Sequence, residues 1–155
     1  MSDNPPLLQP AYYSALVSEF LRADPDAIYG VLSRHHAHTQ EMAQRSAWLE
    51  QITLLQKGLA AVPDAWLAFE FAISRMGKRA DAIIVLSGIV FVLEFKVRAE
   101  AFSGAAIEQV TDYALDLKNF HSASHSRIII PVVIATDAPR KPIQLNLWPD
   151  DVAEP

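Results

Sequence analysis

The hydrophobic and polar positions in the first 60 residues of the chain follow a helical period. Apolar residues recur at the spacing of a helix face and predict one helix over Tyr12–Arg22 and a longer one over Gln40–Ala60. Between them, Asp24 can act as an N-cap and Pro25 as a first helical residue, which predicts the start of a short helix. The Pro-rich residues 1–10 precede these helices, and we expect them to form a loose leader.

The period changes in the second part of the chain. Three runs rich in apolar residues, Trp66–Ile73, Arg79–Leu86 and Ile89–Val97, are separated by the turn sequences MGK and Ser87-Gly88 and predict antiparallel strands. A helical period then extends over Ser103–Asn119, and the run RIIIPVVIAT predicts a last, buried strand. Because a strand that follows a crossover helix normally returns parallel to its predecessor, we expect an α/β domain with a mixed sheet.

The length and composition indicate one folded unit. The chain has 155 residues, of which 51% are apolar, and this is enough for a single hydrophobic core. We expect one domain over residues 11–138, with N-terminal helices in residues 11–60 and a structural core over residues 44–136. Residues 139–155 are then a C-terminal extension.

The net charge and the missing residue types exclude several classes of protein. The net charge of −5 argues against a basic surface on all sides, so any contact with nucleic acid must be local or supplied by a neighbouring domain. Without cysteine the chain forms neither disulfides nor thiolate metal sites, which fits a cytoplasmic protein. No apolar run is long enough to span a membrane, and no secretory signal is recognisable, so we expect no membrane partner.

The two longest predicted strands carry charges at the end of their hairpin. If Ser87-Gly88 is the centre of this hairpin, counting outward pairs Asp81 with Glu94 and Arg79 with Lys96. Directly opposed side chains have Cβ atoms about 4.5–5.5 Å apart. Glu94 and Lys96 are two positions apart on one strand and therefore share a face. Strand geometry thus predicts a cluster of Asp81, Glu94 and Lys96 at one end of the sheet.

Like charges that face each other across two strands destabilise a sheet, so the pairing of two carboxylates needs an explanation. A cation between them provides one, because carboxylate oxygens are hard ligands that suit Mg²⁺ or Mn²⁺. A lysine beside such a metal can polarise a water molecule or offset charge on a transition state. The structural alternative is a surface ion cluster in which Lys96 bridges Asp81 and Glu94.

The order of the predicted elements and the positions of these charges resemble the PD-(D/E)XK nuclease superfamily, which has a restriction-endonuclease-like fold. Its core is a helix, a three-stranded meander, a helix and a strand, with Asp on the second strand and (D/E)-x-K on the third. The matching positions are Asp81 and the sequence EFK at 94–96, while Ala80 replaces the proline of the signature. Gln109 and Tyr113 match the Gln and Tyr that many RecB-like members carry on the next helix.

The resemblance implies a nuclease that hydrolyses phosphodiester bonds in nucleic acid, with DNA as the favoured substrate and Mg²⁺ or Mn²⁺ as the cofactor. Asp81 and Glu94 would hold the metal, and Lys96 would support the nucleophile or the transition state. Glu70, a carboxylate in an apolar strand, would be a further metal ligand or a base that orients water; the alternative is an edge-strand charge. Gln109 would orient a phosphate or a water molecule; the alternative is a surface amide.

Basic residues surround the first turn of the predicted meander. Arg75, Lys78 and Arg79 are candidates for contacts with phosphates at the mouth of the site, and Tyr113 completes the set expected to bind nucleic acid. Arg79 is favoured because it shares the strand parity of Asp81. For Arg75 and Lys78, a solvated basic turn is an equally good explanation.

A second resemblance concerns neighbouring domains. The segments FEFAISRMGKRADAIIVLSGIVFVLEFKV and EQVTDYALDLKNFHSASH resemble the N-terminal domain of bacterial proteins in which a nuclease-like domain precedes a Schlafen-like P-loop NTPase or helicase. The chain has no G-x-x-x-x-G-K-[ST] motif, so the ATP chemistry of such proteins does not carry over. The expected partners are such a domain or a second copy bound through the N-terminal helices. The alternative function is a catalytically inactive domain that binds nucleic acid or assembles with protein.

Overall fold

The computed structural model describes residues 10–35, 42–73, 75–142 and 144–155 of the chain. The predicted start of the long helix, Gln40, lies outside these residues. The predicted boundaries of the three meander strands and of the crossover helix agree with the structure to within one residue. In chain order the elements are β1 (Tyr13–Leu16), α1 (Val17–Arg22), α2 (Pro25–Arg34), α3 (Met42–Gly58), β2 (Trp66–Ile73), β3 (Lys78–Leu86), β4 (Ile89–Lys96), α4 (Gly104–Phe120), the short 3₁₀ helix η1 (Ser122–Ser124) and β5 (Ile129–Ala135).

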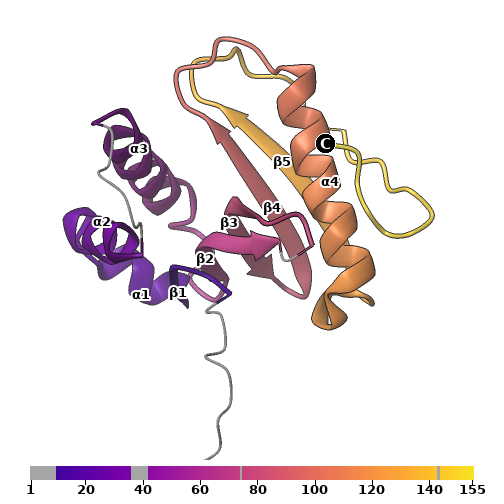
Figure 1. Ribbon diagram of the computed structural model, residues 1–155, viewed down its shortest axis with the longest axis horizontal. Coiled ribbons are helices and arrows are strands. Elements are labelled where there is room, and N and C mark those ends of the chain that lie inside the picture. Colours follow the sequence, from indigo (N-terminus) through magenta and orange to yellow (C-terminus); the bar gives the residue numbers. More distant parts are fainter. Residues whose placement is uncertain (1–9, 36–41, 74, 143) are drawn as a thin grey trace, which may run out of the picture.

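The five strands form one mixed sheet in the order β1-β2-β3-β4-β5. Strands β2, β3 and β4 pair antiparallel as a meander, and α4 then leads to β5, which is parallel to β4. In Figure 1, helices α1–α3 lie on one side of the sheet and α4 on the other. The mixed sheet and the α/β class expected from the sequence are therefore confirmed.

A hydrophobic core lies on each side of the sheet. One core joins α1, α2 and α3 to the strands and includes Phe20, Trp48 and Ile52. The other core joins α4 to the strands and includes Val110 and Tyr113. Because the strands bury apolar side chains on both faces, the sheet is the central layer between two layers of helices.

The first predicted helix, Tyr12–Arg22, is wrong over its first five residues. Tyr13–Leu16 forms strand β1, which pairs antiparallel with β2 and places Tyr13 opposite Phe69. The helical period of these residues is overruled by the ladder that the edge of β2 offers them, since pairing and burial outweigh local propensity. The helix begins only at Val17, whose N–H donates to the carbonyl of Ala65 at 2.8 Å.

The turn between β3 and β4 lies where the sequence predicts it. Leu86 pairs with Ile89, and the two residues between them have positive φ angles, +50° at Ser87 and +80° at Gly88. Two-residue turns with positive φ at both central positions match the twist of antiparallel strands. This turn fixes the register of β3 against β4, and the register determines which side chains lie near each other at the far end of the hairpin.

Candidate active site at the end of the β3–β4 pair

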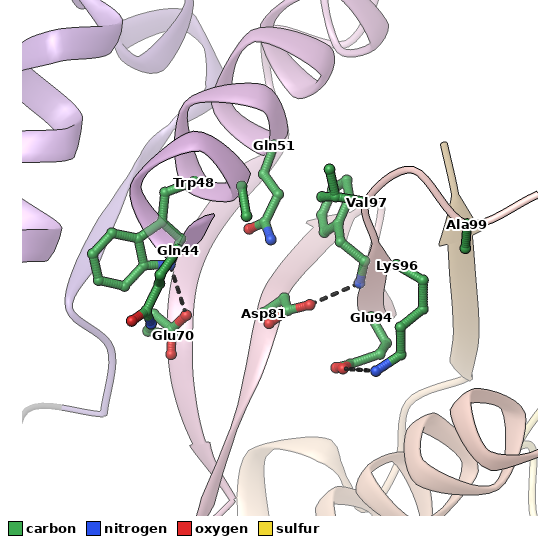
Figure 2. A pocket seen from close by; sticks show the side chains of 11 residues that line it. Gln44, Trp48, Gln51, Glu70, Asp81, Glu94, Lys96, Val97 and Ala99 are labelled. Carbon is green, nitrogen blue, oxygen red and sulfur yellow. Dashed lines mark hydrogen bonds and ion pairs between the residues drawn. The ribbon is translucent and has the colours of Figure 1, made fainter. Parts of the chain in front are cut away.

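Strands β3 and β4 separate at Asp81. Their pairing runs from Leu86–Ile89 to Ala82–Leu93 and does not continue beyond that pair. There the Oδ2 atom of Asp81 accepts a hydrogen bond of 2.7 Å from the backbone N–H of Phe95, as Figure 2 shows. The carboxylate therefore occupies the space in which the ladder would have continued.

This separation corrects the register predicted for the end of the hairpin. The direct pairing of Asp81 with Glu94 and of Arg79 with Lys96 is wrong, because the β3–β4 ladder ends before both pairs. Arg79 pairs with Ala72 on β2. The physical cause is competition for a backbone donor, since the Asp81 carboxylate takes an N–H group of β4. Asp81, Glu94 and Lys96 nevertheless line one cavity, as the cluster prediction requires.

Glu70 has an unusual backbone conformation in the middle of β2. Its φ angle is +53°, in the left-handed region that residues other than glycine rarely adopt. On one side of it, Phe69 and Ala82 belong to the core beneath α1–α3; on the other, Phe71 and Ala80 belong to the core beneath α4. Both paired strands therefore exchange faces at the level of Glu70.

Two hydrogen bonds hold Glu70 in this conformation. The Nη1 atom of Arg79 donates to the Glu70 carbonyl at 2.7 Å. The Trp48 indole N–H donates to Glu70 Oε1 at 3.1 Å, as Figure 2 shows. The Arg79 guanidinium also stacks on the Tyr12 ring, 4.2 Å from its centre. Arg79, expected to bind nucleic acid, thus makes its contacts within the fold and positions Glu70.

A series of polar contacts links β4 to α4. The Lys96 Nζ atom lies 3.2 Å from Glu94 Oε1 and 3.5 Å from Gln109 Oε1. Gln109 Nε2 in turn donates to the Tyr113 hydroxyl at 2.7 Å, one helical turn further along α4. Tyr113 is only 1% exposed, so its position favours support of Gln109 over direct contact with nucleic acid.

These side chains line a cavity of about 400 Å³ between α3 and strands β2, β3 and β4. The strands contribute Glu70, Asp81, Glu94 and Lys96. Helix α3 contributes Gln44, Ala47, Trp48 and Gln51, whose spacing of i, i+3, i+4 and i+7 puts them on one helix face. In Figure 2, Asp81 lies between Glu70 and Glu94, and the α3 side chains face them.

Burial and crowding disfavour the charged forms of the central carboxyls. Burial of the Asp81 carboxyl, and next the negative charge of Glu94, raise the pKa of Asp81 from 3.8 to about 8. Burial also raises the pKa of Glu94, although the charge and the hydrogen bond of Lys96 oppose the rise. Without a cation, Asp81 therefore keeps its proton at neutral pH, and a cation bound beside Asp81 and Glu94 would favour their charged forms.

Asp81 and Glu94 fit a divalent cation. Glu94 is 6% exposed, and its Oε2 atom accepts no hydrogen bond from any residue that the structure describes. Mg²⁺ in proteins binds one or two carboxylates and completes its shell with water, which matches two carboxyls beside a cavity. The described residues include no group of three Asp, Glu, His or Cys side chains that could hold one metal ion. Glu70 is therefore not gathered with Asp81 and Glu94 as a third ligand.

The two remaining basic residues of the first turn differ in their surroundings. The Arg75 guanidinium stacks on the Phe120 ring, 3.8 Å from its centre. Lys78 is exposed, and its charge opposes the rise in the pKa of Glu94. Of the basic residues at this turn, Lys78 is thus the one that combines exposure with an electrostatic effect on the site.

Gln51 lines the cavity although the sequence pattern does not single it out. It follows Trp48 by three positions, and in Figure 2 its side chain extends from α3 toward Asp81. A polar side chain beside the apolar stripe of Trp48 and Ile52 is the only local signal of its position. That signal is weak, because amides are common at the margins of helix faces.

Comparisons of the chain with protein-family models, with curated proteins and with solved structures find no match. Within the described ranges, no helix is both long and apolar enough to cross a membrane. The side chains at the separated ends of β3 and β4 are therefore the basis on which a function can be assigned.

Proposed function

We propose that the domain is a nuclease that hydrolyses phosphodiester bonds in nucleic acid with Mg²⁺ or Mn²⁺, and that its fold is of the restriction-endonuclease-like PD-(D/E)XK type. The order of meander, crossover helix and parallel strand supports the fold assignment. The observation that carries the functional proposal is the pair of crowded carboxyls, Asp81 and Glu94, beside Lys96 in one cavity.

The carboxyl pair is difficult to explain as a purely structural feature. Ionised carboxylates are costly to bury without compensation, and Lys96 contacts only Glu94 among the two. A divalent cation between Asp81 and Glu94 would compensate both. When bound, such an ion lowers the pKa of water and offsets the negative charge of the phosphodiester.

Lys96 is the polar side chain best placed to meet a substrate. Its side chain is 38% exposed, and its Nζ atom is held between Glu94 and Gln109. An ammonium group fixed in this way donates hydrogen bonds to a phosphate oxygen and stabilises the charge that develops there during hydrolysis. Gln109, fixed by Tyr113, keeps the lysine in position.

Glu70 fits the role of a base that orients the attacking water. Its carboxylate lines the same cavity, and Trp48 fixes one of its oxygens by a hydrogen bond. A general base has to reach the proton that it removes, and a carboxylate at the cavity wall meets this requirement. We assign proton acceptance to Glu70 because Asp81 and Glu94 are assigned to the cation.

The proposal predicts cleavage of DNA or RNA in Mg²⁺ or Mn²⁺ and no cleavage in EDTA. Lys96→Ala should lower the rate by roughly 100-fold or more, the usual effect of removing one group that stabilises transition-state charge. End-labelled single- and double-stranded DNA and RNA, resolved on denaturing gels over time, give both the rate and the preferred substrate.

Lys57→Ala is the matched control, because Lys57 is an exposed lysine in the last turn of α3 and does not line the cavity. It should leave the cleavage rate unchanged. The assignment is wrong if the wild-type protein cleaves none of these substrates, or if Lys96→Ala cleaves as fast as the wild type.

A second candidate function is a non-cleaving domain that binds nucleic acid or assembles with protein, including a second copy or a helicase-type partner. The observation that favours it is the internal use of Arg79, which donates to the Glu70 carbonyl and stacks on Tyr12, in a chain of net charge −5. Calorimetric titration with MnCl₂ discriminates the two functions, since a protein without affinity for Mn²⁺ matches the second one.

A further inference from the structure

Two buried oxygen atoms that accept no hydrogen bond lie at the same cavity. One is Glu94 Oε2, and the other is Oε1 of Gln51; both residues are 6% exposed, and neither atom has a donor among the described residues. Buried polar atoms are nearly always hydrogen-bonded, because an unmet acceptor costs free energy in the folded state. The pair therefore indicates that something with positive charge or with hydrogen-bond donors belongs in this cavity.

The position of Gln51 on α3 indicates where in the cavity a hydrogen-bond donor is needed. Gln51 and Trp48 lie on the same face of α3, which lines the cavity. The Gln51 side chain extends toward Asp81 (Figure 2). Gln56, on the same helix, shows how a structural glutamine behaves: its Nε2 atom donates to the carbonyls of Phe20 and Ala23, both at 2.9 Å. Gln56 ties two segments together, whereas Gln51 lines the cavity and its carbonyl oxygen accepts no hydrogen bond from a described residue.

A hydrated divalent cation would satisfy both atoms. A carboxylate oxygen such as Glu94 Oε2 binds the ion directly, while a neutral amide oxygen is a good acceptor for the protons of the surrounding water. Mg²⁺ gives up its water reluctantly and usually keeps several molecules, and side chains that hold such water help to orient the ion and its ligands.

We propose that Gln51 is a positioning residue of the cation site, whose amide oxygen accepts a hydrogen bond from the hydration shell of a divalent cation held by Asp81 and Glu94. This role rests on the cation site of the proposed nuclease and adds a contact from the α3 layer to it. Gln51 thereby couples the N-terminal helices to the carboxylates of the sheet.

The test combines cation affinity with the stability of the cation-free protein. Gln51→Leu should weaken binding of Mn²⁺ and Mg²⁺ by roughly threefold to tenfold, the equivalent of one hydrogen bond. In EDTA the same variant should unfold at an equal or higher urea concentration than the wild type, because it removes an unmet buried acceptor. Calorimetric titration with MnCl₂ and MgCl₂, and urea unfolding in EDTA, measure the two effects.

Gln56→Leu is the matched control on the same helix. It should lower the urea midpoint, because two carbonyls lose their donor, and it should leave the affinity for Mn²⁺ unchanged. Gln51→Glu, which retains an acceptor and adds a charge, should bind Mn²⁺ at least as tightly as the wild type and serves if the leucine variant does not fold.

The outcomes separate this role from the proposed function. If the wild type binds Mn²⁺ and Gln51→Leu binds it equally well, the role of Gln51 is wrong while the carboxylate site stands. If Gln51→Leu loses stability in EDTA and keeps its affinity, Gln51 is a structural residue and the inference also fails. If the wild type binds neither ion, the cation site and the role of Gln51 fail together.

Discussion

At the scale of single residues, Asp81 links the protonation of the cavity to the stability of the fold. Its pKa is about 8 in the folded protein and has the ordinary value of 3.8 when the chain is unfolded. Between these values the folded state keeps a proton that the unfolded state has released. The stabilisation by this proton is therefore full below about pH 4 and is lost as the pH rises toward 8, when no metal is bound.

Asp81→Asn should remove this pH dependence. Asparagine can still accept the hydrogen bond from Phe95 but never becomes charged. In EDTA the variant should gain stability relative to the wild type between pH 5 and pH 8, by at least about 1.4 kcal/mol, the equivalent of one pKa unit. Urea unfolding at both pH values measures the difference. Identical pH dependence in the two proteins would mean that another group titrates.

At the scale of elements, the active-site end of the sheet is built by an exchange of faces in β2 and β3. The left-handed φ angle of Glu70 turns the strand so that its carboxylate reaches the cavity, and Arg79 stabilises the turned carbonyl. Residues held in such conformations are strained by about 1–3 kcal/mol and tend to occur at functional sites. The strain at Glu70 can be measured separately from its carboxylate.

Glu70→Gly and Glu70→Ala both remove the carboxylate and its bond to Trp48, so their difference in stability reports on the backbone alone. In the left-handed region alanine lowers the free energy of unfolding by roughly 1–2 kcal/mol relative to glycine. This is partly offset because the unfolded alanine variant has less conformational entropy than the unfolded glycine variant. We expect the glycine variant to be more stable by about 0.5–1 kcal/mol in urea unfolding.

The control is Ala72→Gly, two residues further along β2, where the structure has no positive φ angle. There alanine should be the more stable residue, as is usual within a strand. If alanine is also the more stable residue at position 70, then the Glu70 backbone is not strained.

How far the sequence predicts these elements depends on the range of the interactions that form them. Strand parity and a two-residue turn are local features, and they are enough to predict that Asp81, Glu94 and Lys96 lie at one cavity. The separation of β3 and β4 and the conformation of Glu70 depend on hydrogen bonds between strands, which leave no local pattern. The sequence does not predict strand β1 for the same reason, because the extended conformation of Tyr13–Leu16 depends on hydrogen bonds to β2.

At the scale of the whole molecule, charge sets a limit on how the domain can hold nucleic acid. The net charge is −5, so phosphates are repelled by most of the surface and attracted only where basic side chains gather. Near the cavity these are Lys96, which lines it, Lys78, whose charge acts on Glu94, and the exposed Arg98, which lies between the lining residues Val97 and Ala99. Binding by so few cations releases few counterions and has a shallow salt dependence.

For duplex DNA, three such contacts predict a slope of about −3 in a plot of log K against log salt concentration. Lys78→Ala should reduce this slope by about one, whereas Lys57→Ala on α3 should not change it. Fluorescence anisotropy of a labelled duplex between 50 and 200 mM KCl measures the slope, with Asp81→Asn in all proteins and EDTA present to prevent cleavage. A slope that Lys78→Ala leaves unchanged would place the nucleic acid away from this cavity, because a phosphate bound beside Glu94 has to sense the charge of Lys78.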